Sequence, residues 1–464
     1  AGECGVGCKE LRNCGGKVQG ARLPVTCSAG LQSGCHAGVH AGFVFVRTWR
    51  FARQPIYHPS DEDLSLGTPI WRSALLGPTL FGMRWGALLL GLLLSFCGLA
   101  RAQWDLEDSH TTADLRGIHN VGGGVAWASG TNGTVLRTED GGYLWQACTI
   151  PPGAEHLDFR GIQAFDANTA IVMSSGKGDL SRLYKTTDGC QTWKLVFTNP
   201  DKDGFWDAVQ AGDPEFPTSG RGGADRALIL GDSVNGQLRI WEWNEGWEER
   251  ELELSYQVRS KGELGEGSFA ASNSVLQLAR TPQLDPTWKY AFRFASGTAT
   301  RSYISIVRDE STPTCEPCRE ESSRVETPMS QNSETAGIFS FDFRSDLVGV
   351  AVGGDYKKPD DTTRAAACSS DGGLSWKLAT TPPHGYRSAV AYDAAVKTWI
   401  TVGPNGTDIS TDDGKSWRAV HPDTGLHEAP DADRNWNALS LPFVVGPNGR
   451  IGKLNPHALA SSPH

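Results

Sequence analysis

The sequence lacks the short motifs that mark many enzymes and cofactor-binding proteins. It has no phosphate-binding loop and no dinucleotide fingerprint. Its histidines, among them His110, His119 and His384, do not show the spacing of metal ligands. After residue 103 no convincing run of apolar residues repeats with the period of a helix, so a helical fold is not expected. We therefore expect no cofactor and no metal site.

Positive charge is scarce in most of the chain. The protein has 43 Lys and Arg against 53 Asp and Glu, and residues 1–102 hold ten of the basic and five of the acidic residues. The remainder therefore carries 33 basic against 48 acidic side chains. Proteins that bind nucleic acid in general neutralise phosphates with basic side chains, so this balance argues against a nucleic-acid partner.

Methionine is also rare, with three residues in the chain, and the first of them is Met83. A basic residue and an apolar run over residues 86–100 follow, and the small-x-small pattern of a cleavage site ends at Ala102. The run is short for a bilayer span, so residues 83–102 favour a secretory signal peptide over an internal membrane helix. This predicts export to the periplasm or the extracellular space, with no membrane span after cleavage.

Residues 1–82 have no methionine, five of the 11 cysteines and no periodic apolar pattern. A signal peptide works only at the start of a chain. We therefore interpret this stretch as translated sequence upstream of the true start, or as an unrelated extension, and assign it no fold. At the other end, residues 456–464 are expected to form a short tail.

Glycine and tryptophan, in contrast, are abundant, with 55 and 16 residues. Both gather in four related eight-residue stretches, which we call the octets. They are TEDGGYLW at 138–145, TTDGCQTW at 186–193, SSDGGLSW at 369–376 and STDDGKSW at 410–417. The shared pattern is Ser/Thr-x-Asp-x-Gly-x-x-Trp.

A turn explains every residue type of this pattern. The aspartate can accept hydrogen bonds from backbone N–H groups two or three residues on, the glycine can adopt a left-handed conformation, and the tryptophan can pack into a sheet. The second octet has Cys190 where glycine is expected, which predicts a slightly different turn. We interpret the octets as structural rather than catalytic. Their aspartate and tryptophan residues are Asp140, Trp145, Asp188, Trp193, Asp371, Trp376, Asp412 and Trp417.

A second, shorter repeat, which we call the hub motif, has a bulky residue, a variable residue, a small residue and usually an apolar one. It occurs seven times, starting at Leu115, Phe159, Trp206, Ser268, Ile338, Tyr386 and Trp436. Repeats of about 40 to 60 residues that contain only short strands and turns are typical of propeller blades. We therefore predict an all-β, seven-bladed β-propeller over residues 103–455 with four-stranded antiparallel blades. The last repeat supplies about three strands, and the predicted mature N-terminal strand, starting at Gln103, completes that blade.

The octets resemble the Asp-box of BNR-type propellers, a group that includes sialidases, some endoglucanases and many non-enzymatic proteins. The spacing and the Arg-Gly-Ile starts at Arg116 and Arg160 are most similar to the photosystem II assembly and stability factor family and its bacterial homologues. The resemblance covers roughly residues 103–455 and implies an exported scaffold with arginines near the propeller axis. It is specific for the fold and not for function, because the same blades serve many roles.

The variable positions of the hub motif should meet at one mouth of the axis. The guanidinium group of arginine suits carboxylate or phosphate groups. A polar arc beside an apolar wall therefore predicts a site for a protein partner or a small anionic ligand. We expect the propeller to be monomeric and non-enzymatic. Local pairing of Arg116 with Asp114, and of Arg160 with Asp158, is the open alternative, and no such partner is evident for Arg387. The arc would contain Arg387, Asn437, Arg116, Arg160 and Asp207, and the wall Phe269 and Phe339.

A glycoside hydrolase is the alternative function. Its catalytic groups would come from Asp207, Glu263, Glu266 and Tyr386. However, sialidases have six blades and an Arg-Ile-Pro signature that this chain lacks, and a propeller endoglucanase uses a cleft between two propellers. We therefore expect that the protein is not an enzyme.

The cysteines and one basic loop complete the set of candidate features. Cys148 and Cys190 could bridge neighbouring blades, and Cys315 and Cys318 could form a small disulfide, which would leave Cys368 unpaired. Lys357 and Lys358, in GGDYKKPDD, are expected in a solvated loop that could border the mouth.

Overall fold

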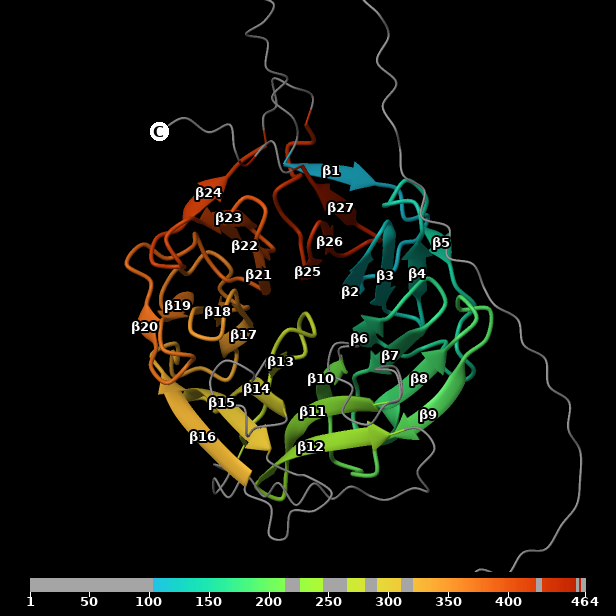
Figure 1. The fold of residues 1–464 in the computed structure, drawn as a ribbon, viewed down its shortest axis with the longest axis horizontal. Helices are drawn as coiled ribbons and strands as arrows, with labels where there is room; N and C mark the ends of the chain where they lie inside the picture. Colours follow the sequence, from blue (N-terminus) through green and yellow to red (C-terminus); the bar gives the residue numbers. More distant parts are fainter. Residues whose placement is uncertain are drawn as a thin grey trace, which may run out of the picture. The chain divides into compact units, whose positions relative to one another are not determined.

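The computed structural model describes residues 103–212, 226–244, 265–279, 290–309, 320–422, 428–455 and 459. Over these residues, seven antiparallel sheets surround a central axis as the blades of a propeller (Figure 1). The predicted seven-bladed β-propeller is therefore confirmed. The predicted signal peptide, residues 1–82, Glu263, Cys315 and Cys318 lie outside the described residues.

Each blade is a meander of strands numbered outward from the axis. Blade 1 contains β2 (Leu115–Gly122), β3 (Val125–Gly130), β4 (Val135–Thr138) and β5 (Gln146–Ala147). Blade 2 contains β6 (Phe159–Ala164), β7 (Ala170–Ser174), β8 (Arg182–Thr186) and β9 (Lys194–Thr198), with the short 3-10 helix η1 (Gly178–Leu180) before β8. The described part of blade 3 contains β10 (Trp206–Ala211), β11 (Arg226–Val234) and β12 (Gln237–Asn244).

The remaining blades follow the same plan. Blade 4 contains β13 (Leu276–Ala279), β14 (Tyr290–Gly297), β15 (Ser302–Asp309) and β16 (Glu320–Thr327). Blade 5 contains β17 (Ala336–Phe343), β18 (Gly349–Asp355), β19 (Ala366–Ser369) and β20 (Lys377–Leu378). Blade 6 contains β21 (Ala389–Asp393), β22 (Thr398–Gly403), β23 (Gly406–Ser410) and β24 (Arg418–Val420).

Blade 7 joins the two ends of the described chain. It contains β25 (Ala438–Ser440), β26 (Phe443–Val445) and β27 (Ile451–Leu454), and its outer strand is β1 (Trp104–Glu107). Trp104 pairs with Leu454 in antiparallel register, is buried, and donates its indole N–H to Thr407 Oγ1 at 3.1 Å. Pairing of β1 with β27 gives both strands a neighbour and so removes an open sheet edge. Cleavage of the chain before Gln103 stays a prediction.

The ring has two different faces because the blades are antiparallel meanders. We call the end at which the innermost strands begin the mouth face. It carries the connections into each innermost strand and the hairpins between the second and third strands. The octets connect third to fourth strands and therefore lie at the opposite end, the octet face.

The hub motif forms a β-bulge in four of the seven blades. The register of the innermost strand shifts between Leu115 and Gly117 in blade 1, and at the same motif position in blades 2, 3 and 5. A bulge leaves one residue unpaired and turns its side chain away from the ladder. The bulged residue in each case is the variable one predicted to face the axis. These four residues are Arg116, Arg160, Asp207 and Phe339.

The small residue after the bulge is needed because neighbouring inner strands converge. A Cβ atom on Gly117 would lie 2.5 Å from Ser129 Oγ and 3.1 Å from the carbonyl oxygen of Arg160 in the next blade. A Cβ atom on Gly161 would lie 2.7 Å from Val209 Cγ1 in the blade after that. Both contacts are closer than side-chain carbons tolerate, so glycine is required at these two positions.

All four octets form the same turn, with one difference from expectation. Asp140 Oδ1 accepts a hydrogen bond from the N–H of Leu144 at 3.0 Å, four residues on rather than two or three, and the other three octets repeat this contact. Cys190 adopts φ 62°, and its N–H bonds Thr186 Oγ1 as Gly142 bonds Thr138 Oγ1. The prediction of a different turn at Cys190 is therefore wrong. The four tryptophans are buried between blades.

A disulfide joins blade 1 to blade 2. It connects Cys148, after β5, with Cys190 in the octet of blade 2, and the sequence separation is 42 residues. The nearby Thr149 Oγ1 also donates to the carbonyl oxygen of Cys190 at 2.7 Å. Cys368 on β19 is the one free cysteine among the described residues.

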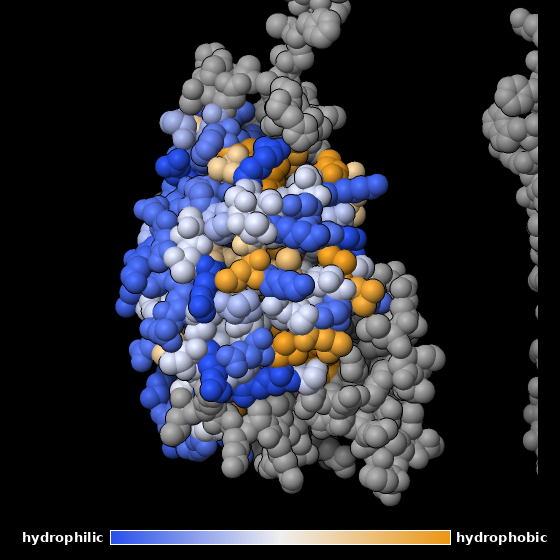
Figure 2. Space-filling model, turned by 90° about the vertical axis from the view of Figure 1, so that its left-hand side faces the viewer, coloured by the Kyte–Doolittle hydropathy of each residue, from blue (hydrophilic) through white to orange (hydrophobic). Residues whose placement is uncertain are grey.

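The apolar core is divided into layers between adjacent blades. One layer packs Trp127 and Val135 of blade 1 against Phe159 and Val172 of blade 2. Equivalent layers join blade 1 to blade 7 and blade 7 to blade 6. Figure 2 shows the side of the ring that carries β20 and β24 as mostly hydrophilic, with small separate apolar spots. Apolar burial therefore holds the blades to one another, and this part of the rim offers no broad apolar patch.

The contact between blades 1 and 2 predicts a pH-dependent stability. His119 on β2 accepts a hydrogen bond on Nδ1 from the N–H of Ala164 at 3.0 Å, and burial lowers the pKa of the imidazole from 6.5 to about 4. The unfolded chain therefore binds this proton more readily, so the stabilisation is complete above pH 6.5 and is lost as the pH falls toward 4. His119→Gln should remove this component, on the order of 2 kcal/mol.

Urea unfolding at a series of pH values measures the effect. The free energy of unfolding of the wild-type protein should fall more steeply than that of His119→Gln as the pH drops through the range of the shifted pKa. Parallel curves for the two proteins would contradict a lowered pKa of the half-buried His119 at this interface.

Candidate ligand-binding mouth

Two arginines of the predicted arc lie side by side at the mouth face and share one carboxylate. Nε of Arg116 is 3.1 Å from Asp158 Oδ1, and Nε of Arg160 is 2.9 Å from Asp158 Oδ2. Arg116 also has Asp114 within 3.9 Å, whereas Arg160 uses Nη1 to bond the carbonyl oxygen of Ala270 at 3.1 Å. Both side chains keep 28% of their surface exposed. We call Arg116 and Arg160 the arginine pair.

The arginine pair is held in place by ion pairs and carries little net positive charge together with its two aspartates. Asp158 lies between two guanidinium groups and cancels one of their two charges, and Asp114 reduces the rest. The pairing of Arg160 with Asp158, which the sequence left open, is therefore present. Arg116 lies closer to Asp158 of the next blade than to Asp114. The remaining N–H groups of the two guanidiniums can still donate hydrogen bonds to a carboxylate or a phosphate.

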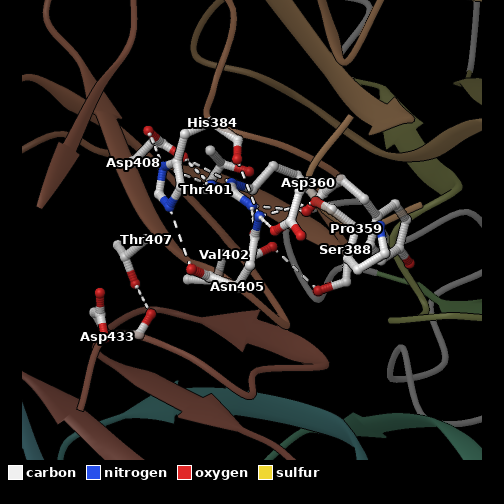
Figure 3. Close-up of polar contacts among 12 residues, drawn as sticks. Pro359, Asp360, His384, Ser388, Thr401, Val402, Asn405, Thr407, Asp408 and Asp433 are labelled. Atoms are coloured by element: carbon white, nitrogen blue, oxygen red, sulfur yellow. Dashed lines mark hydrogen bonds and ion pairs between the residues drawn. The ribbon is translucent and has the colours of Figure 1, made fainter. Parts of the chain in front are cut away.

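Arg387 does not belong to this arc. Its side chain is fully buried, and Nε donates to Asp408 Oδ2 of β23 at 2.8 Å, with Nη2 as a second donor to the same oxygen. His384 Nδ1 lies 2.8 Å from the other oxygen of Asp408 (Figure 3). Burial lowers the pKa of Arg387, and Asp408 opposes that shift. The expectation that Arg387 has no carboxylate partner and faces the mouth is therefore wrong.

The sequence could not reveal the Asp408 partner because it is 21 residues away and on another strand. Asn405, in the hairpin before β23, also accepts from Arg387 and donates to the carbonyl oxygen of Pro359 in blade 5 at 2.8 Å (Figure 3). This cluster therefore connects two blades. A ligand in the solvent therefore cannot reach the guanidinium group of Arg387.

Two further residues of the predicted arc have structural contacts. Asn437 uses Nδ2 to donate to the carbonyl oxygen of Leu115 at 2.8 Å, which joins blade 7 to blade 1. Asp207 is buried, and its Oδ2 has no hydrogen-bond partner in the part of the chain that the structure describes. Burial raises the pKa of Asp207 well above its usual range, Asp232 raises it further, and Arg160 lowers it. Burial therefore favours the neutral form of the Asp207 carboxyl group.

The predicted apolar wall is present as stacked rings. Phe269 and Phe339 stack with ring centroids 3.9 Å apart, and Tyr386 packs edge-on against Phe339 at 4.7 Å. Tyr356 contacts the other side of Phe339 at 6.1 Å and is 47% exposed. The rings of Phe269, Phe339 and Tyr356, which we call the aromatic ladder, thus run outward from the axis toward the rim of blade 5. Tyr356 was missed, although it precedes the Lys357 and Lys358 loop that the sequence placed at the rim.

The segment that contains the fourth hub motif, starting at Ser268, crosses the axis and precedes the innermost strand of blade 4. Residues 267–275, the crossing segment, precede β13 and extend toward the centre of the ring (Figure 1). Ser272 Oγ donates to the carbonyl oxygen of Ser388 in blade 6 at 2.8 Å, and Asn273 Oδ1 accepts from the N–H of Val209 in blade 3 at 2.7 Å. Ala270 and Phe269 belong to this segment. It therefore brings the arginine pair and the aromatic ladder together.

The described residues that the glycoside hydrolase alternative would use are not exposed to solvent as a catalytic pair. Glu266 is 3% exposed, bonds Ser296 Oγ at 2.7 Å and lies 2.9 Å from Arg324 Nη2. Tyr386 is buried, and burial raises its pKa. Asp207 is 1% exposed. A glycoside hydrolase needs two carboxyl groups that reach the substrate, and these side chains do not.

The described residues contain no group of three or more His, Cys, Asp and Glu side chains that could hold a metal ion. Within the same residues, no helix is long and apolar enough to cross a bilayer.

The different environments of Arg387 and Arg116 predict different effects on stability. Arg387→Ala would leave Asp408 charged and buried without its guanidinium partner, which should cost about 3 to 5 kcal/mol. Arg116→Ala removes a partly exposed ion pair and should cost less than about 1 kcal/mol. Chemical unfolding of the two variants compares these values directly, and equal losses would show that Arg387 is not the buried partner of Asp408.

Comparison with known proteins gives structural likeness only. No protein-family model matches the sequence, and no curated protein is similar to it. A solved structure described as "YCF48 bound to D1 peptide" has 16% identity and a TM-score of 0.47 over 77% of this chain and 96% of that chain. YCF48 from Cyanidioschyzon merolae has 16% identity and a TM-score of 0.47 over 77% of this chain and 100% of that chain. The WD40 β-propeller domain of Doa1 has 10% identity and a TM-score of 0.45 over 78% and 100% of the two chains. This chain is similar to these proteins in its propeller fold, and identities this low carry no information about function.

Proposed function

We propose that this chain is a non-enzymatic binding propeller that holds an acidic segment of a protein partner at the mouth face. The observation that carries the proposal is the arginine pair, in which Asp158 fixes two partly exposed guanidiniums beside the aromatic ladder. Fixed donors next to an apolar surface are typical of binding sites. Little side-chain entropy is lost on binding, because the carboxylate and the Ala270 carbonyl already hold both arginines.

The chemistry of the mouth favours binding over catalysis. Asp207, Glu266 and Tyr386 are buried, so these candidate catalytic groups do not reach a substrate. The net charge of the arginine pair and its two aspartates is close to zero, so affinity must come from directed hydrogen bonds and apolar contact. A small anionic ligand would use only the arginines, whereas an extended peptide segment can use both surfaces.

We also propose that the protein works outside the cytoplasm. The apolar run over residues 86–100 and the Cys148–Cys190 disulfide support export to an oxidising compartment. The octets and hub motifs, which resemble those of exported BNR-type propellers and photosystem II assembly factors, favour a scaffold role of the same general kind.

A peptide array tests the proposed binding. Fluorescently labelled full-length protein is applied to short peptides that differ in their content of Asp, Glu and aromatic residues. Acidic peptides should be retained by the wild type and lost in the double variant Arg116→Ala/Arg160→Ala. Retention should fall with added salt, because part of the interaction is electrostatic.

Arg344→Ala is the matched control. Arg344 pairs with Asp413 at 2.6 Å on the octet face and is 32% exposed, close to the exposure of the arginine pair. This variant should bind as the wild type does. Absence of acidic-peptide binding in the wild type, or an equal loss in Arg344→Ala, would contradict the proposed function.

A further inference from the structure

Tyr356 is an exposed aromatic side chain at the start of the mouth-face loop between β18 and β19 of blade 5. It is 47% exposed, and its ring contacts Phe339, which stacks on Phe269. Phe269 immediately precedes Ala270, whose carbonyl oxygen accepts the hydrogen bond from Arg160. A chain of contacts therefore links the arginine pair to Tyr356 through Phe269 and the buried Phe339.

The loop that carries Tyr356 is held by hydrogen bonds at its base. The N–H of Tyr356 donates to the carbonyl oxygen of Thr335 at 3.2 Å. The buried Asp355 carboxylate accepts from Thr335 Oγ1 at 2.6 Å and from the N–H of Lys357 at 3.0 Å. The N–H of Lys358 closes the turn onto the carbonyl oxygen of Asp355 at 2.9 Å. Tyr356 is therefore presented by a fixed turn.

Blade 6 fixes the same loop from the other side. Asn405 Nδ2 donates to the carbonyl oxygen of Pro359 at 2.8 Å and to Asp360 Oδ1 at 3.1 Å, and Arg387 holds the amide oxygen of Asn405 (Figure 3). The buried ion pair of Arg387 with Asp408 thus supports the loop through Asn405. An exposed aromatic ring on such a loop binds with little loss of conformational entropy.

The charges of the loop do not dominate this surface. Lys357 and Lys358 are followed by Asp360 and Asp361, and Lys358 lies 3.7 Å from Asp355. The aromatic ring, rather than a basic patch, is the distinctive feature at this end of the chain of contacts. The arginine pair supplies the charge recognition at the other end.

We propose that the aromatic ladder is the second half of the partner site and receives an aromatic or large apolar side chain of the bound peptide. The partner segment then carries an acidic residue for the arginine pair and, next to it, an aromatic residue that packs against Phe269 and Tyr356. This inference rests on the proposed function, because the same extended peptide occupies both halves of the site.

Three peptides of equal length separate the two halves. The first contains glutamates and one phenylalanine, the second replaces the phenylalanine by alanine, and the third replaces the glutamates by glutamine. Binding to the full-length protein is measured by fluorescence anisotropy. The first peptide should bind the wild type about five- to tenfold more tightly than the second, as expected for one added aromatic contact.

Substitution of Tyr356 should remove only the aromatic preference. Tyr356→Ala should bind the first and second peptides equally, whereas Tyr356→Phe, which keeps the ring, should retain the difference. Tyr143→Ala is the matched control, because Tyr143 is 89% exposed and lies on the octet face. It should behave as the wild type does.

The outcomes distinguish the two proposals. If no glutamate peptide binds the wild type, the proposed function fails and this inference fails with it. If glutamate peptides bind through Arg116 and Arg160 but the phenylalanine has no effect, only the role of the aromatic ladder is overturned. Two other results would overturn the role of the aromatic ladder by assigning this surface to another occupant. One is binding of an oligosaccharide such as cellohexaose in place of any peptide. The other is a dimer that dissociates in the Tyr356→Ala variant.

Discussion

Convergence of the innermost strands on one axis is the constraint on which the rest of the structure depends. The strands approach so closely that a Cβ atom at Gly161 would lie 2.7 Å from Val209 of the neighbouring blade, and one at Gly117 would lie 3.1 Å from the Arg160 carbonyl oxygen. The bulge before each glycine turns one side chain out of the ladder. The bulge and the small residue after it therefore have two consequences. They allow tight packing at the axis, and they place variable side chains near it.

The fate of each bulged side chain follows from its nearest electrostatic partner. The guanidiniums of Arg116 and Arg160 are kept at the mouth face because Asp158 lies between them. Asp207, without a comparable partner, is buried and has a raised pKa. Arg387, at the equivalent motif position, turns into its own blade because Asp408 lies there. A repeated backbone position thus produces a site that is not symmetric.

This asymmetry agrees with the proposed role as a binding propeller. Asp158 and the Ala270 carbonyl hold the arginine pair at the mouth, and the candidate catalytic groups Asp207, Glu266 and Tyr386 are buried. The crossing segment joins the arginine pair to the aromatic ladder, and the buried cluster around Arg387 supports the loop of Tyr356. Recognition by such a surface depends on shape and on directed hydrogen bonds more than on net charge.

The sequence by itself determined the fold, the number of blades and the positions of the hub motifs, four of which form bulges. Octets and hub motifs are local patterns, because every contact that defines the Asp140 turn lies within eight residues. The composition of the site was not determined in this way. The partners of Arg387, Arg160 and Asn437 are Asp408, Ala270 and Leu115, which lie 21, 110 and 322 residues away. The Asn437 contact forms only when the ring closes, the Arg160 contact needs the crossing segment in place, and the Arg387 contact needs the strands of blade 6 to pair. Only the tertiary structure therefore decided which predicted arginines face the mouth.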